Sequence, residues 1–109
     1  MEQLDSKRFR AQIPIIFARD GQREEARGLV YNLSAEGCKV TSNTRVTPGT
    51  YLTLRLYLPG SHAPVAVELA AVRWAQDWDF GVTYVHMQNE ELQRLTGYLA
   101  SLETAGAPR

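Results

Sequence analysis

Two short polar segments contain the residues of this chain whose types and spacing suggest chemistry. The first is a basic cluster, Lys7-Arg8-Phe9-Arg10, directly before a short apolar run. Arginine can fork onto a phosphate or onto the O6 and N7 edge of a guanine, and it can stack on a base. The cluster alone also fits a solvated N-terminal arm. We therefore weigh an anion clamp against a solvated arm.

The second segment is NLSAEG, residues 32–37, at the junction of two expected strands. As a plain turn, its Asn and Ser would bond their own backbone, and its Gly would take a positive φ. As a binding element, the same short polar side chains would reach a ligand, because a hydroxyl and an amide offer both donors and acceptors. The segment by itself leaves both interpretations open.

Catalytic and metal-binding patterns are missing from the sequence. It has no Gly-rich phosphate loop before a helix, no His-x-x-x-His pair and no paired cysteines. His62 and His86 lie far apart, and Cys38 falls on the apolar face of an expected strand, where a buried inert thiol is typical. We expect no enzyme, no metal and no cofactor. The lone cysteine allows no intrachain disulfide and fits a reducing compartment.

Two tryptophans lie near the end of the strand-rich region. Trp74 ends an expected strand and is interpreted as a core or barrel-mouth residue. Trp78 lies between two aspartates in an expected turn and should be exposed, where it could stack on a base or face a partner.

Composition limits the class of protein. The chain has 109 residues, enough for one domain, and is 44% hydrophobic and 22% charged, which is ordinary for a globular protein. Its formal net charge is zero, which argues against general binding of DNA or RNA. No apolar run approaches the roughly 20 residues that span a bilayer, and the first residues lack a secretory signal pattern. We expect a cytoplasmic protein with no membrane partner.

The elements that must position these segments are mostly strands. Alternation is clearest over 51–58, where four leucines share one face. Residues 65–74 also fit a helix, but Val65, Val67, Leu69 and Ala71 share a strand face between turn signals, so we favour a strand. Pro14 suggests a strand edge or start. The expected strands span residues 12–19, 25–33, 37–41, 51–58, 65–74 and 80–85.

A helix is expected after the last strand. Asn89 is a suitable N-cap, and leucines at 92, 95, 99 and 102 form one apolar stripe. The order predicts an all-β fold with a C-terminal helix, namely a six-stranded antiparallel β-barrel whose helix covers a mouth or packs on the side. The expected units are a flexible arm over 1–11, the barrel and helix over 12–103, and a frayed tail over 104–109.

Together, a basic arm, a hairpin and Asn-x-Ser-x-x-Gly resemble the PilZ domain family. Arg73-Trp74, then Phe80-Gly81-Val82 and a terminal helix, also look like the end of such a domain, so the resemblance covers about residues 7–102. The resemblance implies a six-stranded barrel from a bacterial protein that binds cyclic di-GMP. The family's ligand signature is an Arg-x-x-x-Arg arm plus Asp/Asn-x-Ser-x-x-Gly on the barrel.

The two halves of that signature match this chain to different degrees. Asn32, Ser34 and Gly37 match the second motif in full, and the resemblance implies that the first two bond the ligand while the glycine permits the turn. Arg8 matches the first arginine of the arm. Four residues later the chain has Gln12 instead of the second arginine, and Arg10 lies between the two positions.

We therefore expect a cyclic di-GMP receptor that changes its surface on binding and signals to an unidentified protein partner. Its expected ligand-binding residues are Arg8, Arg10, Gln12, Asn32, Ser34 and Gly37. The alternative is a degenerate PilZ domain, without the ligand, that acts as a protein–protein adaptor. Replacing Gln12 by arginine would separate the two hypotheses.

Overall fold

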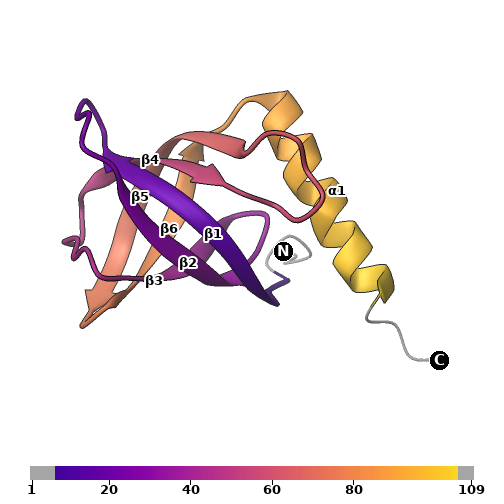
Figure 1. Ribbon diagram of the computed structural model, residues 1–109, viewed down its shortest axis with the longest axis horizontal. Helices are drawn as coiled ribbons and strands as arrows, with labels where there is room; N and C mark the ends of the chain where they lie inside the picture. The colour runs from indigo at the N-terminus through magenta and orange to yellow at the C-terminus, as the bar shows by residue number, and fades with distance from the viewer. Residues whose placement is uncertain (1–6, 106–109) are drawn as a thin grey trace, which may run out of the picture.

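The structure is a computed structural model that describes residues 7–105. These residues form six strands and one helix, in the order that the sequence predicts (Figure 1). The elements are β1 (Phe9–Arg19), β2 (Ala26–Leu33), β3 (Gly37–Ser42), β4 (Tyr51–Leu56), β5 (Val65–Gln76), β6 (Asp79–His86) and α1 (Asn89–Ala105).

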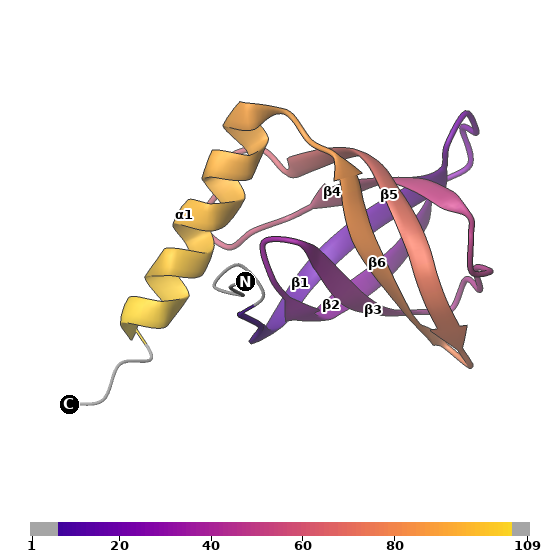
Figure 2. The same ribbon diagram turned by 180° about the vertical axis from the view of Figure 1, so that it is seen from behind.

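The six strands close into an antiparallel barrel with the neighbour order β1-β2-β3-β6-β5-β4. The predicted fold class is therefore confirmed. The helix lies beyond one end of the barrel, together with the β2–β3 turn, and the β1–β2 and β5–β6 hairpins lie at the opposite end (Figures 1 and 2). Closure gives each of the six strands two neighbours, whereas an open sheet would leave two edge strands exposed.

The barrel interior follows from two-residue alternation. On β4, Leu52, Leu54 and Leu56 are all buried, and Leu58 just beyond the strand is buried too, as the alternation predicts. Phe17 and Phe80 meet edge to face across the interior, with ring centroids 5.2 Å apart. The hydrophobic core thus fixes which face of each strand points outward.

The first strand differs from the prediction in two respects. It begins at Phe9 rather than Gln12, because Phe9 and Ala11 pack against the core and Phe9 pairs with Leu33 on β2. Residues 9–11 of the expected arm are therefore part of the barrel. Pro14 lies inside β1 rather than at its start. It stands where the β1–β4 ladder ends, one residue before Ile15, and its carbonyl accepts a hydrogen bond from the Tyr57 N–H at 2.9 Å. Its missing N–H therefore falls at an open edge of β1, where a proline is tolerated.

Val65–Gln76 form a strand, β5, and not a helix, but the alternation of buried and exposed residues along it is interrupted. The register with β4 shifts between Val67 and Ala70, where β5 has one extra residue, and the register with β6 shifts between Leu69 and Ala70 and again between Val72 and Trp74. Val65 and Val67 are buried as predicted, but Leu69 is only half-buried, and the next three residues, Ala70, Ala71 and Val72, are all buried, so the alternation is lost. The single face predicted for Val65, Val67, Leu69 and Ala71 is therefore wrong beyond Val67, because β-bulges reset which side each residue faces.

The helix is anchored to the barrel by apolar and polar contacts. Leu95 and Leu99 from the predicted stripe are buried in the main core, so α1 covers one end of the barrel. Arg94 donates to Glu91 at 3.2 Å, to the Ser61 hydroxyl at 2.7 Å and to the Ala63 carbonyl. These bonds hold α1 against the loop between β4 and β5.

The helix ends at Ala105, and residues 1–6 and 106–109 lie outside the described part of the chain, as does most of the expected tail. Across residues 7–105, no helix is long and apolar enough to cross a membrane. Nor does this part of the chain bring three or more His, Cys, Asp or Glu side chains together as a metal site would require.

Candidate functional site

The basic arm meets the polar turn. The Arg8 guanidinium Nη1 donates to Asn32 Oδ1 at 3.0 Å, although 24 residues separate them in the sequence. The preceding Lys7 forms an exposed ion pair with Glu103 of α1, at 2.7 Å. One end of the barrel therefore joins the arm, the β2–β3 turn and the helix.

Ser34 holds the turn together. Its side chain is buried, and its Oγ accepts hydrogen bonds from the backbone N–H groups of Glu36 (3.1 Å) and Gly37 (3.2 Å). The same hydroxyl lies 3.2 Å from the Gly37 carbonyl, to which it donates its proton. All of these bonds stay inside the turn, so Asn32 is the more accessible of the two polar side chains in the motif.

Gly37 is needed for a different reason from the one predicted. It is not among the glycines with positive φ, which are Gly21, Gly49 and Gly60. Instead, a Cβ at Gly37 would lie 2.1 Å from the carbonyl oxygen of Val82 on β6. The glycine therefore lets β6 approach the β2–β3 turn, and the turn conformation itself does not require it.

Arg10 and Gln12 lie on the same outer face of β1. Arg10 is the register partner of Asn32, which places their side chains next to each other on the barrel surface. A bulge follows, in which Ala11 and Gln12 together oppose Tyr31. Arg10, Gln12, Tyr31 and Asn32 line one open hollow of about 580 Å³. The structure thus brings Arg8, Arg10, Gln12 and Asn32 to one place.

A buried thiol, Cys38, and a half-buried tyrosine, Tyr84, lie against the turn. Cys38 is buried, and desolvation raises the pKa of its thiol to about 12, against smaller lowering effects from Tyr84 and Arg8. Burial also raises the pKa of Tyr84 well above its usual value, and the neighbouring Cys38 adds to that effect. The Tyr84 hydroxyl donates to the Ser34 carbonyl at 3.3 Å. Both groups are neutral at ordinary pH and act structurally.

Sequence reasoning missed the part played by Tyr84. It belongs to β6, 50 residues from Ser34, and its backbone N–H also donates to the Glu36 carbonyl at 2.9 Å. The contact depends on the β3–β6 pairing, which is a non-local feature of the barrel. No local pattern in the sequence points to it.

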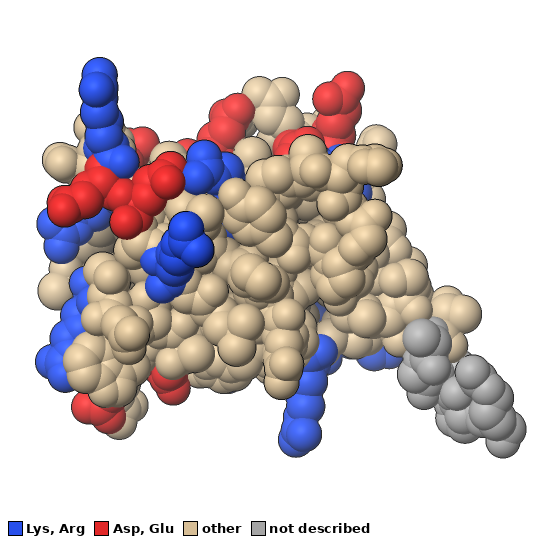
Figure 3. Space-filling model, in the orientation of Figure 1, with Lys and Arg blue, Asp and Glu red and all other residues tan. Residues whose placement is uncertain are grey.

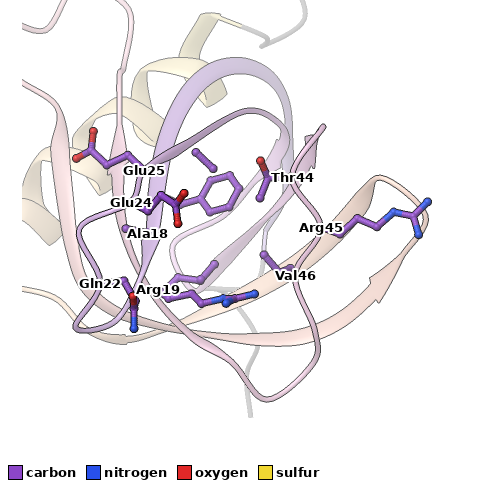
Figure 4. A pocket seen from close by; sticks show the side chains of 11 residues that line it. Ala18, Arg19, Gln22, Glu24, Glu25, Thr44, Arg45 and Val46 are labelled. Atoms are coloured by element: carbon purple, nitrogen blue, oxygen red, sulfur yellow. The ribbon is translucent and has the colours of Figure 1, made fainter.

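A second hollow, of about 250 Å³, lies at the opposite end of the barrel, between the β1–β2 hairpin and the loop after β3 (Figure 4). Arg19 points toward Val46 within it, whereas the Arg45 side chain extends away (Figure 4). Charged side chains of both signs gather at this end, and the middle of the same face carries few charges (Figure 3). Such mixed charge favours no single ligand class.

Both tryptophans are on the surface. Trp78 is 50% exposed, as predicted, and the Arg45 guanidinium lies 4.4 Å from its ring centroid. Trp74 is 37% exposed and lies on the outside of the barrel, so its assignment to the core or the mouth is wrong. It covers Gly81, which has no side chain to fill that space.

A closed six-stranded barrel with a terminal helix, and with basic and amide side chains gathered at its β2–β3 turn, defines a small β-barrel domain with a candidate anion-binding surface. The comparisons then identify the family. The family model described as PilZ domain matches residues 3–101, so the chain belongs to the PilZ domain family. No curated protein sequence matches the chain.

Solved structures of PilZ proteins share the fold. The inhibitor of motility MotI/DgrA from Bacillus subtilis superposes with a TM-score of 0.76 and 23% identity over 92% of this chain and 50% of its own. This chain therefore spans about half the length of that protein. The PilZ domain of CeSA from a cellulose-synthesizing bacterium superposes with a TM-score of 0.70 and 19% identity, over 90% of this chain and 99% of its own. The PilZ domain of YcgR from Escherichia coli, solved with c-di-GMP, superposes with a TM-score of 0.69 and 12% identity, over 91% of this chain and 90% of its own.

Proposed function

We propose that this chain is a bacterial, cytoplasmic receptor for cyclic di-GMP that signals to a protein partner. The observation that carries the proposal is the 3.0 Å contact between Arg8 and Asn32, because it joins the arm to the barrel at the family's ligand motif. Membership of the PilZ family and the c-di-GMP named for the similar YcgR domain support the choice of ligand.

Each side chain in this assembly has a role in the proposal. Arg8 and Arg10 are forked cations that suit phosphates and guanine edges, and Asn32 supplies a donor and an acceptor for one guanine. Gly37 keeps β6 close behind the turn, and Ser34 holds the turn in shape. Ser34 thus acts on the ligand by positioning Asn32.

Ligand binding would also change the surface that a protein partner contacts. A ligand that bonds Asn32 competes with Arg8 for the same oxygen and so moves the arm. The neighbouring Lys7 holds Glu103 on α1, so a moved arm releases this exposed ion pair. The surface formed by the arm and the helix would then differ between the free and bound states, and this surface is what a partner would recognise.

Isothermal titration calorimetry with cyclic di-GMP tests the receptor. We expect binding in the micromolar range, and we expect Arg8→Ala and Asn32→Ala to weaken it about tenfold or more, since a charge-assisted hydrogen bond contributes about 1.5–3 kcal/mol. Arg23→Ala makes the same change on the exposed β1–β2 hairpin and should leave binding unchanged. If titration of the wild-type protein with cyclic di-GMP produces no heat, the proposed receptor function is refuted.

A second function, that of an adaptor without a nucleotide, is favoured by Gln12. This neutral residue stands where the family has its second arginine, and it lines the same hollow as Arg10 and Asn32. The variant Gln12→Arg separates the two functions. A large gain in affinity for cyclic di-GMP would mean that the natural site is weakened and would favour the adaptor. No gain would mean that Arg10 already supplies the second cation.

A further inference from the structure

The hollow between β1 and β2 is lined by two carboxamides and one guanidinium. Gln12 and Asn32 supply the amides, Arg10 supplies the guanidinium, and Ala11 and Tyr31 complete the lining. No carboxylate is among these five residues, and Gln12 is exposed on the outer face of β1. A carboxamide has an N–H donor and an acceptor oxygen side by side. Gln12 can therefore offer both groups to a molecule that fills the hollow.

Gln12 and Asn32 lie on neighbouring strands but not opposite each other. Asn32 pairs with Arg10, whereas Gln12 lies two residues farther along β1, in the bulge that opposes Tyr31. Strands lie about 4.8 Å apart and rise about 3.3 Å per residue, so the Cα atoms of Gln12 and Asn32 are roughly 7–8 Å apart. The hollow thus has two polar positions, one formed by Arg10 with Asn32 and the other by Gln12. Each position can contact a different part of one ligand.

A guanidinium and a carboxamide match different purines. Guanine presents two acceptors, N7 and O6, along one edge, and two N–H groups of an arginine match them. Adenine presents the N7 acceptor beside the N6 amino donor. A glutamine matches this edge by donating its N–H to N7 and accepting from N6 through its carbonyl oxygen. Against guanine, the same glutamine would place its carbonyl oxygen beside a second acceptor, so a base that lies against Gln12 should be adenine.

We propose that Gln12 binds an adenine, so that the preferred ligand of the site is a mixed cyclic dinucleotide with one guanine and one adenine. This inference rests on the proposed function, in which Arg10 and Asn32 bind one guanine. The second base of the same ligand then lies against Gln12. Cyclic di-GMP enters the same site, but its second guanine is mismatched there. Cyclic di-AMP is mismatched at the other position, because adenine would turn its amino donor toward the guanidinium of Arg10.

Calorimetric titration of the wild-type protein with three cyclic dinucleotides tests this preference. The mixed ligand, 3′,3′-cyclic GMP–AMP, should bind between about fivefold and about 150-fold more tightly than cyclic di-GMP, the range for one bidentate contact with the matching base. Cyclic di-AMP should bind more weakly than the mixed ligand. The three ligands share the same ring of ribose and phosphate groups, so differences in affinity report the bases.

A variant at Gln12 assigns the preference to this residue. Gln12→Leu removes the amide and keeps a side chain of similar size, so the affinities for cyclic GMP–AMP and cyclic di-GMP should become nearly equal. Gln22→Leu makes the same change on the exposed β1–β2 hairpin, at the opposite end of the barrel, and should keep the wild-type ratio of affinities. A ratio measured within one protein cancels the folded fraction, so it remains informative if a variant is less stable.

The outcomes separate this inference from the proposed function. If neither cyclic di-GMP nor cyclic GMP–AMP produces heat with the wild-type protein, the receptor function and the adenine preference are both refuted. If cyclic di-GMP binds at least as tightly as cyclic GMP–AMP, the adenine preference alone is refuted. If only cyclic GMP–AMP binds, the preference is supported and cyclic di-GMP is excluded as the ligand. If Gln12→Leu keeps the preference for the mixed ligand, the role assigned to Gln12 is wrong.

Discussion

Adding one methyl group at Gly37 tests the close approach of β6 to the β2–β3 turn. In Gly37→Ala the new Cβ would lie 2.1 Å from the Val82 carbonyl oxygen, and real Cβ atoms essentially never approach other atoms closer than 3.0 Å. The obstacle is backbone, so the β3 and β6 strands must move apart by nearly 1 Å. The hydrogen bond from Tyr84 N–H to the Glu36 carbonyl, 2.9 Å long, lies beside this contact.

The expected cost follows from those contacts. Overpacking a tight site costs about 1–3 kcal/mol, and weakening one or two hydrogen bonds adds about 1 kcal/mol each. We therefore expect Gly37→Ala to lower the free energy of unfolding by about 3 kcal/mol. Total stabilities of domains are about 5–15 kcal/mol, so this loss is a large share of the whole.

Urea unfolding measured by circular dichroism checks the value. The control is Gly97→Ala, which makes the same change on the exposed side of α1, where a Cβ meets nothing within 4 Å. Because alanine favours the helix, this control should gain about 0.5–1 kcal/mol. A loss below about 1 kcal/mol for Gly37→Ala would refute the claim that the close approach of β6 requires this glycine.

Two further predictions concern buried groups. The raised pKa of Cys38, about 12 against 9.0, means that the unfolded chain loses this proton first. Stability should therefore fall as pH rises above about 9, by about 2 kcal/mol at pH 10.5 relative to Cys38→Ala in parallel urea titrations. An equal pH dependence in both proteins would contradict the burial of the thiol. Ser34→Ala should cost about 2 kcal/mol in the same assay, because the buried Gly37 N–H and the partly buried Glu36 N–H lose their acceptor. The exposed helix variant Ser101→Ala should cost nothing, and equal behaviour of the two serine variants would exclude the proposed role of Ser34 in the turn.

The candidate site was partly predictable because its two motifs are each short and local. Arg8 and Arg10 fall on alternate residues, and alternation alone places them on one face of an extended chain. The run from Asn32 to Gly37 contains its own turn chemistry, and Ser34 bonds the turn as that chemistry suggests. The sequence also predicts that Cys38 is buried, which the structure confirms.

The sequence by itself determined the order of six strands and one helix, because alternation and turn residues act within a few positions of each other. Only the tertiary structure decided which strands became neighbours, and with them the contacts that matter. Bulges on β1, β2 and β5 shift the register by single residues, and each shift changes which side chains meet across strands.

These shifts place Arg10 beside Asn32 and Trp74 over Gly81. The need for glycine at position 37 likewise comes from a carbonyl 45 residues away, and no turn rule could supply it. Such contacts depend on barrel closure, which is a property of the whole chain and not of any segment.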